Sequence, residues 1–260
     1  MDGDARADKR RRRLELADHF LRIASAAVVA GIVGGLVAAG GSRVAMRVSA
    51  LMADPCAGVM TENGNACGKF TAEGTVGLIF FGVLFSGIPG GLVYAAAAPW
   101  LRPLGRLRGP AFGVAAFALG GFTVIEGDNP DFQRFGSPGL NVVMFAVLFL
   151  IFGLVTAPTF DAVARRMPHL PPRRPLGLAR LAGYGVMFFT AIVLGVTAAF
   201  GLGLGLLILI SFAFVHRLGE VVTEARDHGD GRATFAYLLP LAFVAAAGLF
   251  TIQSITRVLR

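Results

Sequence analysis

Six long stretches without a single Asp, Glu, Lys or Arg constrain the fold of this chain more than any other feature. They cover residues 23–42, 74–101, 109–125, 135–160, 181–215 and 233–256. At 1.5 Å of helix per residue, about 20 apolar residues cross the hydrocarbon core of a bilayer. The stretches are apolar on every face, which is typical of helices, whereas barrel strands alternate in polarity. The sequence therefore predicts an all-α fold, a polytopic transmembrane helix bundle.

The number of spans depends on the fifth stretch, residues 181–215. It holds 35 residues, and one helix of that length would measure roughly 52 Å, far more than the bilayer core. Gly201, Gly203 and Gly205 interrupt it, so we expect the chain to fold back there. This gives seven spans, and one long bent helix gives six as the alternative. Trp100, Tyr94 and Tyr184 fall near the predicted cytoplasmic interface, where such rings prefer to lie. Seven spans place Tyr237 there too, whereas six would place it outside.

The basic residues predict the orientation of the bundle. One cluster, 9–13, precedes the first stretch, and two arginine-rich segments, 102–108 and 165–180, follow the second and fourth stretches. Alternating spans place all three on the same side, and the positive-inside rule makes that side the cytoplasm. The N-terminus is therefore predicted to be cytoplasmic.

This orientation divides the chain into two predicted parts. Residues 1–20 form a basic cytoplasmic leader, and residues 21–260 form a single transmembrane helical domain with an extracytoplasmic loop at 53–72. The net charge of +8 is spread over the segments between spans and forms no basic face for nucleic acid. The predicted partners are therefore the lipid bilayer and, at the basic loops, anionic lipid headgroups.

Composition indicates the source membrane and the redox state of the cysteines. Lys9 and Lys69 are the only lysines beside abundant Arg, Ala and Gly, a bias typical of high-GC bacterial genomes, so we expect a bacterial plasma membrane. The only cysteines, Cys56 and Cys67, lie in the predicted extracytoplasmic loop, where thiols are usually oxidised. A disulfide across this loop is predicted to contribute roughly 3 kcal/mol; two free thiols are the alternative.

Small residues and one proline predict how the helices pack. Ala27, Gly31 and Gly35 recur every four residues, so one helix face allows close approach by another helix, within the bundle or in a homo-oligomer. In the second stretch we expect a helix kink at Pro89, Gly90 and Gly91, because proline cannot donate a backbone hydrogen bond. Broken helices often line transporter sites.

Polar residues gather at the predicted extracytoplasmic edge and form what we call the outer rim. Its members are Arg43, Arg47, Glu73, Glu126, Asp128, Asp131 and Asn141. Arg43 and Arg47 are four residues apart and share a helix face, and they depart from the positive-inside pattern. Either the rim lines a vestibule that binds an ion or small polar solute, or it consists of interhelical ion pairs and helix caps. The sequence leaves both interpretations open.

The predicted spans contain no motif for covalent catalysis, haem binding or zinc binding. They contain no lysine for a Schiff base and no buried histidine pair for haem, and the cysteines and histidines lack zinc-site spacing. We therefore predict no cofactor, no metal site and no catalytic residue, and an enzyme is the least favoured functional class.

The chain also resembles uncharacterised multipass membrane proteins of high-GC bacteria. The resemblance rests on the segments 80–85 (Phe-Phe-Gly-Val-Leu-Phe) and 128–132 (Asp-Asn-Pro-Asp-Phe), and it implies no activity. From the residues themselves, the apolar midplane favours a non-catalytic subunit or assembly factor that docks a membrane-protein partner. The alternative is a channel or transporter-like protein that binds a small solute or ion from the extracytoplasmic side.

Overall fold

The computed structural model describes residues 2–52, 59–60, 67, 69, 71–125, 130–169, 178–200, 215, 218–222, 224 and 239–260. Every regular element that it assigns there is helical, which confirms the all-α prediction. In chain order the elements are α1 (Asp2–Met52), α2 (Ala72–Phe81), η1 (Gly82–Gly87), α3 (Ile88–Leu101), η2 (Arg102–Leu107), α4 (Arg108–Gly120), η3 (Gly121–Thr123), α5 (Pro130–Arg134), α6 (Pro138–Arg166), α7 (Leu178–Phe200) and α10 (Leu239–Val258).

Four helical runs in the described part are long and apolar enough to cross a membrane. They are Leu14–Met52, Ala72–Thr123, Pro138–Arg166 and Pro240–Val258. The second run is interrupted at Gly105, whose φ of 52° and ψ of −116° are not helical. This break lies between the two apolar stretches 74–101 and 109–125 from which separate spans were predicted.

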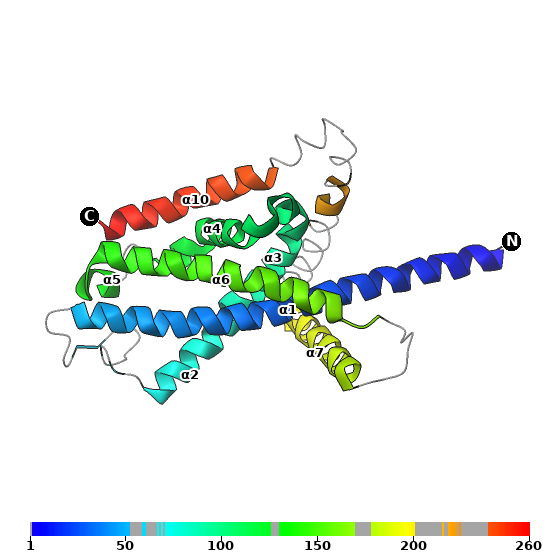
Figure 1. The fold of residues 1–260 in the computed structure, drawn as a ribbon, viewed down its shortest axis with the longest axis horizontal. Coiled ribbons are helices and arrows are strands. Elements are labelled where there is room, and N and C mark those ends of the chain that lie inside the picture. The colour runs from blue at the N-terminus through cyan, green and yellow to red at the C-terminus, as the bar shows by residue number, and fades with distance from the viewer. Residues whose placement is uncertain are drawn as a thin grey trace.

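The helices form one bundle in which α6 is central (Figure 1). It packs against α1 on one side and α4 on the other, and α10 covers the far side of α4. The helix α1 also packs against η1, α3 and α7. Its N-terminal part extends well beyond the bundle, and α2 points away from α6.

Glycines allow α1 to touch η1 and α3 backbone to backbone. A Cβ atom added at Gly31 would lie 2.3 Å from the carbonyl oxygen of Gly87, and one added at Gly91 would lie 2.2 Å from that of Ala27. Gly35 has the Cα atom of Gly87 3.0 Å from its ideal Cβ position. The small-residue face of α1 is therefore occupied within this chain, at a separation that no side chain larger than hydrogen permits.

A second close crossing joins α4 to α6. A Cβ atom on Gly153 would lie 2.3 Å from the Gly109 oxygen and 2.6 Å from the Gly113 nitrogen. Beside it, Tyr94 packs edge-on against Phe112, with 5.0 Å between ring centroids. Both rings are almost fully buried, so a dense aromatic core fills the space between the two glycine crossings.

The helix irregularity near Pro89 is a π-helical segment. The residues 82–87 form η1, and the Ile88 amide donates to the Val83 carbonyl, five residues earlier. Pro89 follows within the first turn of α3, so its missing N–H falls where the helical ladder has already been rearranged. The kink at Pro89, Gly90 and Gly91 stays a prediction, with η1 as the local distortion beside it.

Candidate functional site

A cavity of about 720 Å³ lies between α1, η1, α3, α4 and α6. Along α1 its wall runs from Gly35 to Ser49, and along α6 it runs from Asn141 to Phe152. Gly35 and Ser49 are fourteen positions apart, which corresponds to roughly 21 Å of helix, so the cavity reaches deep into the bundle. Its size falls in the range of roughly 300–1,000 Å³ that is typical of small-molecule sites.

The mouth of the cavity is cationic. Arg43, Arg47 and Lys69 line it together with one carboxylate, Asp131. The Nε atom of Arg43 is buried and has no hydrogen-bond partner in the described part of the chain. A buried guanidinium nitrogen without a partner is costly, and an anion in the cavity would relieve that cost.

The interior of the cavity is apolar. Beyond the mouth, no ionisable side chain of the described residues lines it. The hydroxyl of Ser42 already donates to the Ala39 carbonyl at 2.8 Å, whereas Ser86 on η1 is exposed. The walls are mainly methyl, aliphatic and aromatic groups of α1, α4 and α6, so the cavity favours an apolar occupant below a charged mouth.

Phe112 and Phe152 form the deep end of the cavity. The ring of Phe152 lies against two glycines, because a Cβ atom at Gly90 would be 2.7 Å from its Cζ and one at Gly34 would be 2.8 Å from its Cε2. Phe112 stacks obliquely on Phe152 at 6.2 Å between centroids, and both rings belong to the buried core. The cavity therefore stops at tightly packed aromatic rings.

Asn141 supports the mouth as a structural residue. It is 4% exposed, and its amide nitrogen donates to the carbonyls of Phe135 at 2.8 Å and Phe132 at 3.4 Å. Its side-chain oxygen accepts from the Ser49 hydroxyl on α1. The amide is thus fully used in tying α5 and α1 to α6, which leaves it no hydrogen for a ligand.

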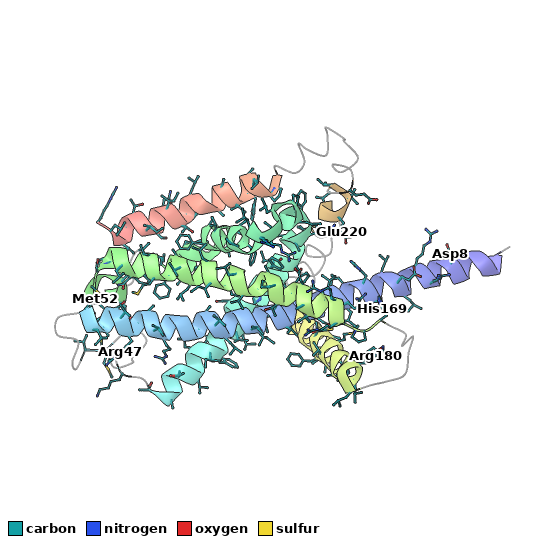
Figure 2. The ribbon with its side chains drawn as sticks, viewed as in Figure 1. Asp8, Arg47, Met52, His169, Arg180 and Glu220 are labelled. Atoms are coloured by element: carbon teal, nitrogen blue, oxygen red, sulfur yellow. The ribbon has the colours of Figure 1, made fainter. Side chains whose placement is uncertain are left out.

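Ion pairs and hydrogen bonds hold the helices together at the end of the bundle opposite the cavity mouth. Asp18 Oδ2 lies 3.0 Å from His169 Nδ1, and the Tyr184 hydroxyl donates to the His169 carbonyl at 2.7 Å. Arg108 forms an ion pair with Asp161. Figure 2 shows His169 far along the bundle from Arg47 and Met52. The first two contacts join α1 and α7 to the segment that follows α6, and the ion pair joins α4 to α6. None of these residues lines the large cavity.

Four residues of the predicted outer rim line this one cavity: Arg43, Arg47, Asp131 and Asn141. Glu73 does not, since it lies exposed in the first turn of α2, where a carboxylate favours the positive end of the helix dipole. Glu126 and Asp128 lie outside the described residues. Cys56 does too, so its disulfide with Cys67 stays a prediction, although no free cysteine occurs among the described residues.

Sequence reasoning missed Lys69 and the serines of α1. Ser42 and Ser49 lie on the α1 face that continues from Gly35, through Ala39, to the cavity mouth. Ser42 and Ser49 are seven residues apart, which is about two helical turns and places them on a single helix face, so that pattern could have identified them. Lys69 follows no helical pattern, and no such signal pointed to it.

Metal chemistry is not indicated by the described residues, in which no group of three or more His, Cys, Asp or Glu side chains could hold an ion. No family model, no curated protein and no solved structure matches this chain. The function proposed below therefore rests on the cavity and its mouth.

Proposed function

We propose that this chain is a multipass membrane protein that binds a small ligand in its cavity, which the ligand reaches from the predicted extracytoplasmic end. The observation that carries the proposal is the continuity of the cavity from Arg43 at its mouth to Gly90 and Phe152 at its deep end. A purely structural rim would fill the space between its charged groups with side chains. Here the rim instead opens into about 720 Å³ of space.

The extracytoplasmic position of the cavity mouth follows from the predicted membrane topology. Seven spans, a cytoplasmic N-terminus and a bacterial plasma membrane remain part of the proposal. The four apolar runs support it by length and composition, while residues 201–214 and 225–238, which complete the predicted last spans, lie outside the described residues. The segregation of Asp18, His169 and Arg108 to one end and of Arg43 and Arg47 to the other agrees with two membrane interfaces.

Accessibility of an engineered cysteine tests the proposal. Ser86 lines the cavity, whereas Leu84 lies on the same π-helical segment and does not. In intact cells, Ser86→Cys is expected to react with a membrane-impermeant, anionic methanethiosulfonate, and Leu84→Cys is not, because only the first thiol faces water. Relative to the rates of both reagents with a free thiol, the cationic mouth should favour the anionic reagent over its cationic analogue, and Arg43→Ala should reduce that preference. Equal, negligible labelling of both cysteines would contradict the proposal.

The other predicted function, a non-catalytic subunit or assembly factor, stays a prediction. The helix α2 exposes large apolar side chains, among them Val76, Phe80 and Phe81, and either lipid or a partner helix could cover them. Purification in a mild detergent distinguishes the two functions. A stoichiometric partner protein favours a subunit, and a monomer or homo-oligomer that still binds a ligand favours the cavity function.

A further inference from the structure

We infer that the ligand of this cavity is an anionic amphiphile, with a carboxylate or phosphate head at the mouth and a single apolar chain in the interior. The inference rests on the proposed function and names its ligand class. Three features of the structure carry it: the charge of the mouth, the polarity of the interior and the side on which the cavity is open.

The mouth selects the sign of the head. Three cationic side chains and one carboxylate line it among the described residues. Arg43 is half-buried, and its Nε atom has no partner there. A guanidinium group binds carboxylate and phosphate oxygens through short, charge-assisted hydrogen bonds, so an anionic head satisfies a group that the fold leaves unsatisfied.

The interior selects the tail. A free inorganic anion would use only the mouth, and the apolar space from Ala39 to Phe152 would gain nothing from its presence. A hydrocarbon chain fills that space with dispersion contacts to the walls. The combination of a charged mouth and an uncharged, elongated interior matches a molecule that is itself charged at one end only.

The open side of the cavity faces lipid. At the level of Ala39 on α1 and Phe112 on α4 the walls are closed, since these residues are 4% and 1% exposed. On η1 and α3, by contrast, the lining residues Phe85 and Val93 are 69% and 45% exposed. The helix α2 that precedes them packs against η1 and α1. Apolar side chains at a lateral opening are typical of a path from the bilayer, through which the chain of an amphiphile slides without crossing water.

Specificity is expected to come from the head. Lipid tails are about as apolar as a leucine side chain, so moving a hydrocarbon chain from the bilayer into the cavity changes its free energy little. The contact between the head and Arg43 has no equivalent in a zwitterionic bilayer. Removing either the negative charge or the guanidinium should therefore weaken binding about tenfold or more.

The test is saturable binding of radiolabelled ligands to the full chain in phosphatidylcholine nanodiscs. Four probes separate the contribution of the anionic head from that of the apolar chain. Oleate and oleyl phosphate carry both groups, oleyl alcohol carries the chain alone, and inorganic phosphate carries the anion alone. We expect one or both anionic amphiphiles to bind at one site per chain, and oleyl alcohol and phosphate to bind at least about tenfold more weakly.

Two variants locate the site, each with a matched control. Arg43→Ala should weaken oleate or oleyl phosphate about tenfold, whereas Arg134→Ala, which removes an exposed arginine outside the cavity, should not. Arg43→Lys retains a cation and should restore part of the affinity. Ser86→Phe should block the interior, and Leu84→Phe on the same segment should not. The comparison of probes on the unaltered protein stands even where a variant fails to fold.

The outcomes separate this inference from the function on which it rests. Arg43-dependent binding of phosphate as tight as that of the amphiphiles would overturn the amphiphile and keep a small-anion site. If oleyl alcohol binds as tightly as the anionic amphiphiles and does not depend on Arg43, the ligand needs no anionic head, and the cavity binds an apolar ligand. If no probe binds and Ser86→Cys is unreactive, both the inference and the proposed function fail.

Discussion

Replacing Gly31 by alanine tests the closest helix contact in the bundle. The added Cβ atom would lie 2.3 Å from the Gly87 oxygen and 2.9 Å from its carbonyl carbon. Both are backbone atoms and cannot rotate away, so α1 and η1 must separate by about 1 Å to restore an ordinary contact. Overpacking of this kind costs about 1–3 kcal/mol.

The same helix provides the control. Gly40 also lies inside α1, and a Cβ atom there meets nothing within 4 Å. Alanine favours a helix over glycine by up to about 1 kcal/mol at either position. This gain cancels when the two variants are compared, so the difference between Gly31→Ala and Gly40→Ala isolates the steric term. We expect Gly31→Ala to be less stable than Gly40→Ala by about 1–3 kcal/mol.

The assay is reversible unfolding in mixed micelles by titration with sodium dodecyl sulfate, followed by the loss of helical circular dichroism. Gly40→Ala should unfold at the same or a higher fraction of the denaturing detergent than the unaltered chain, and Gly31→Ala at a lower one. If the two variants unfold together, the backbones of α1 and η1 do not touch at Gly31. The reasoning from the glycine contacts would then be refuted.

Three further predictions concern the cavity mouth and the loop beside it. Asn141→Asp should lower the stability in the same assay by about 3 kcal/mol or more, because it buries a carboxylate against two carbonyl oxygens; unchanged stability would contradict the assigned hydrogen bonds. Gly136→Ala should cost about 1–2 kcal/mol, since Gly136 has a φ of 71° and its Cβ would lie 3.1 Å from the Ser49 oxygen. Cys67 should react with iodoacetamide only after reduction, and Cys56→Ser should make it reactive without a reductant; a thiol that reacts in both states refutes the disulfide.

The helical class of the chain could be predicted because apolar stretches of this length have few alternatives. The extent of the helices was less predictable. The first apolar stretch begins at residue 23, whereas the helix α1 that contains it begins at Asp2. Hydropathy marks where lipid can surround a helix, whereas the helix itself continues through residues of good helix propensity. Pairs such as Arg11 with Glu15, 3.0 Å apart, add to its stability.

The outer rim was predictable in part for a related reason. Arg43 and Arg47 attract attention because they break the distribution of charge along the chain, and four-residue spacing places them together whatever the helix packs against. Glu73 belongs to α2, which points away from α6 (Figure 1), and it does not line the cavity. Its place in the outer rim stays a prediction. A sequence does not show the angle between two halves of a distorted helix.

The position of the cavity is explained by the close glycine contacts between helices, which occur at one level of the bundle. Gly31 and Gly35 fix α1 against η1, and Gly153 fixes α6 against α4, so the helices touch at the level of the aromatic core. Toward the mouth no such glycine pairs join α2 to α6, and α2, which continues into the π-helical segment, packs mainly against η1 and α1. Rigid helices that are held together at one level and diverge beyond it must leave space between them. The Arg43 guanidinium lines the mouth of that space, and the proposed ligand recognition depends on this placement rather than on the rim charges by themselves.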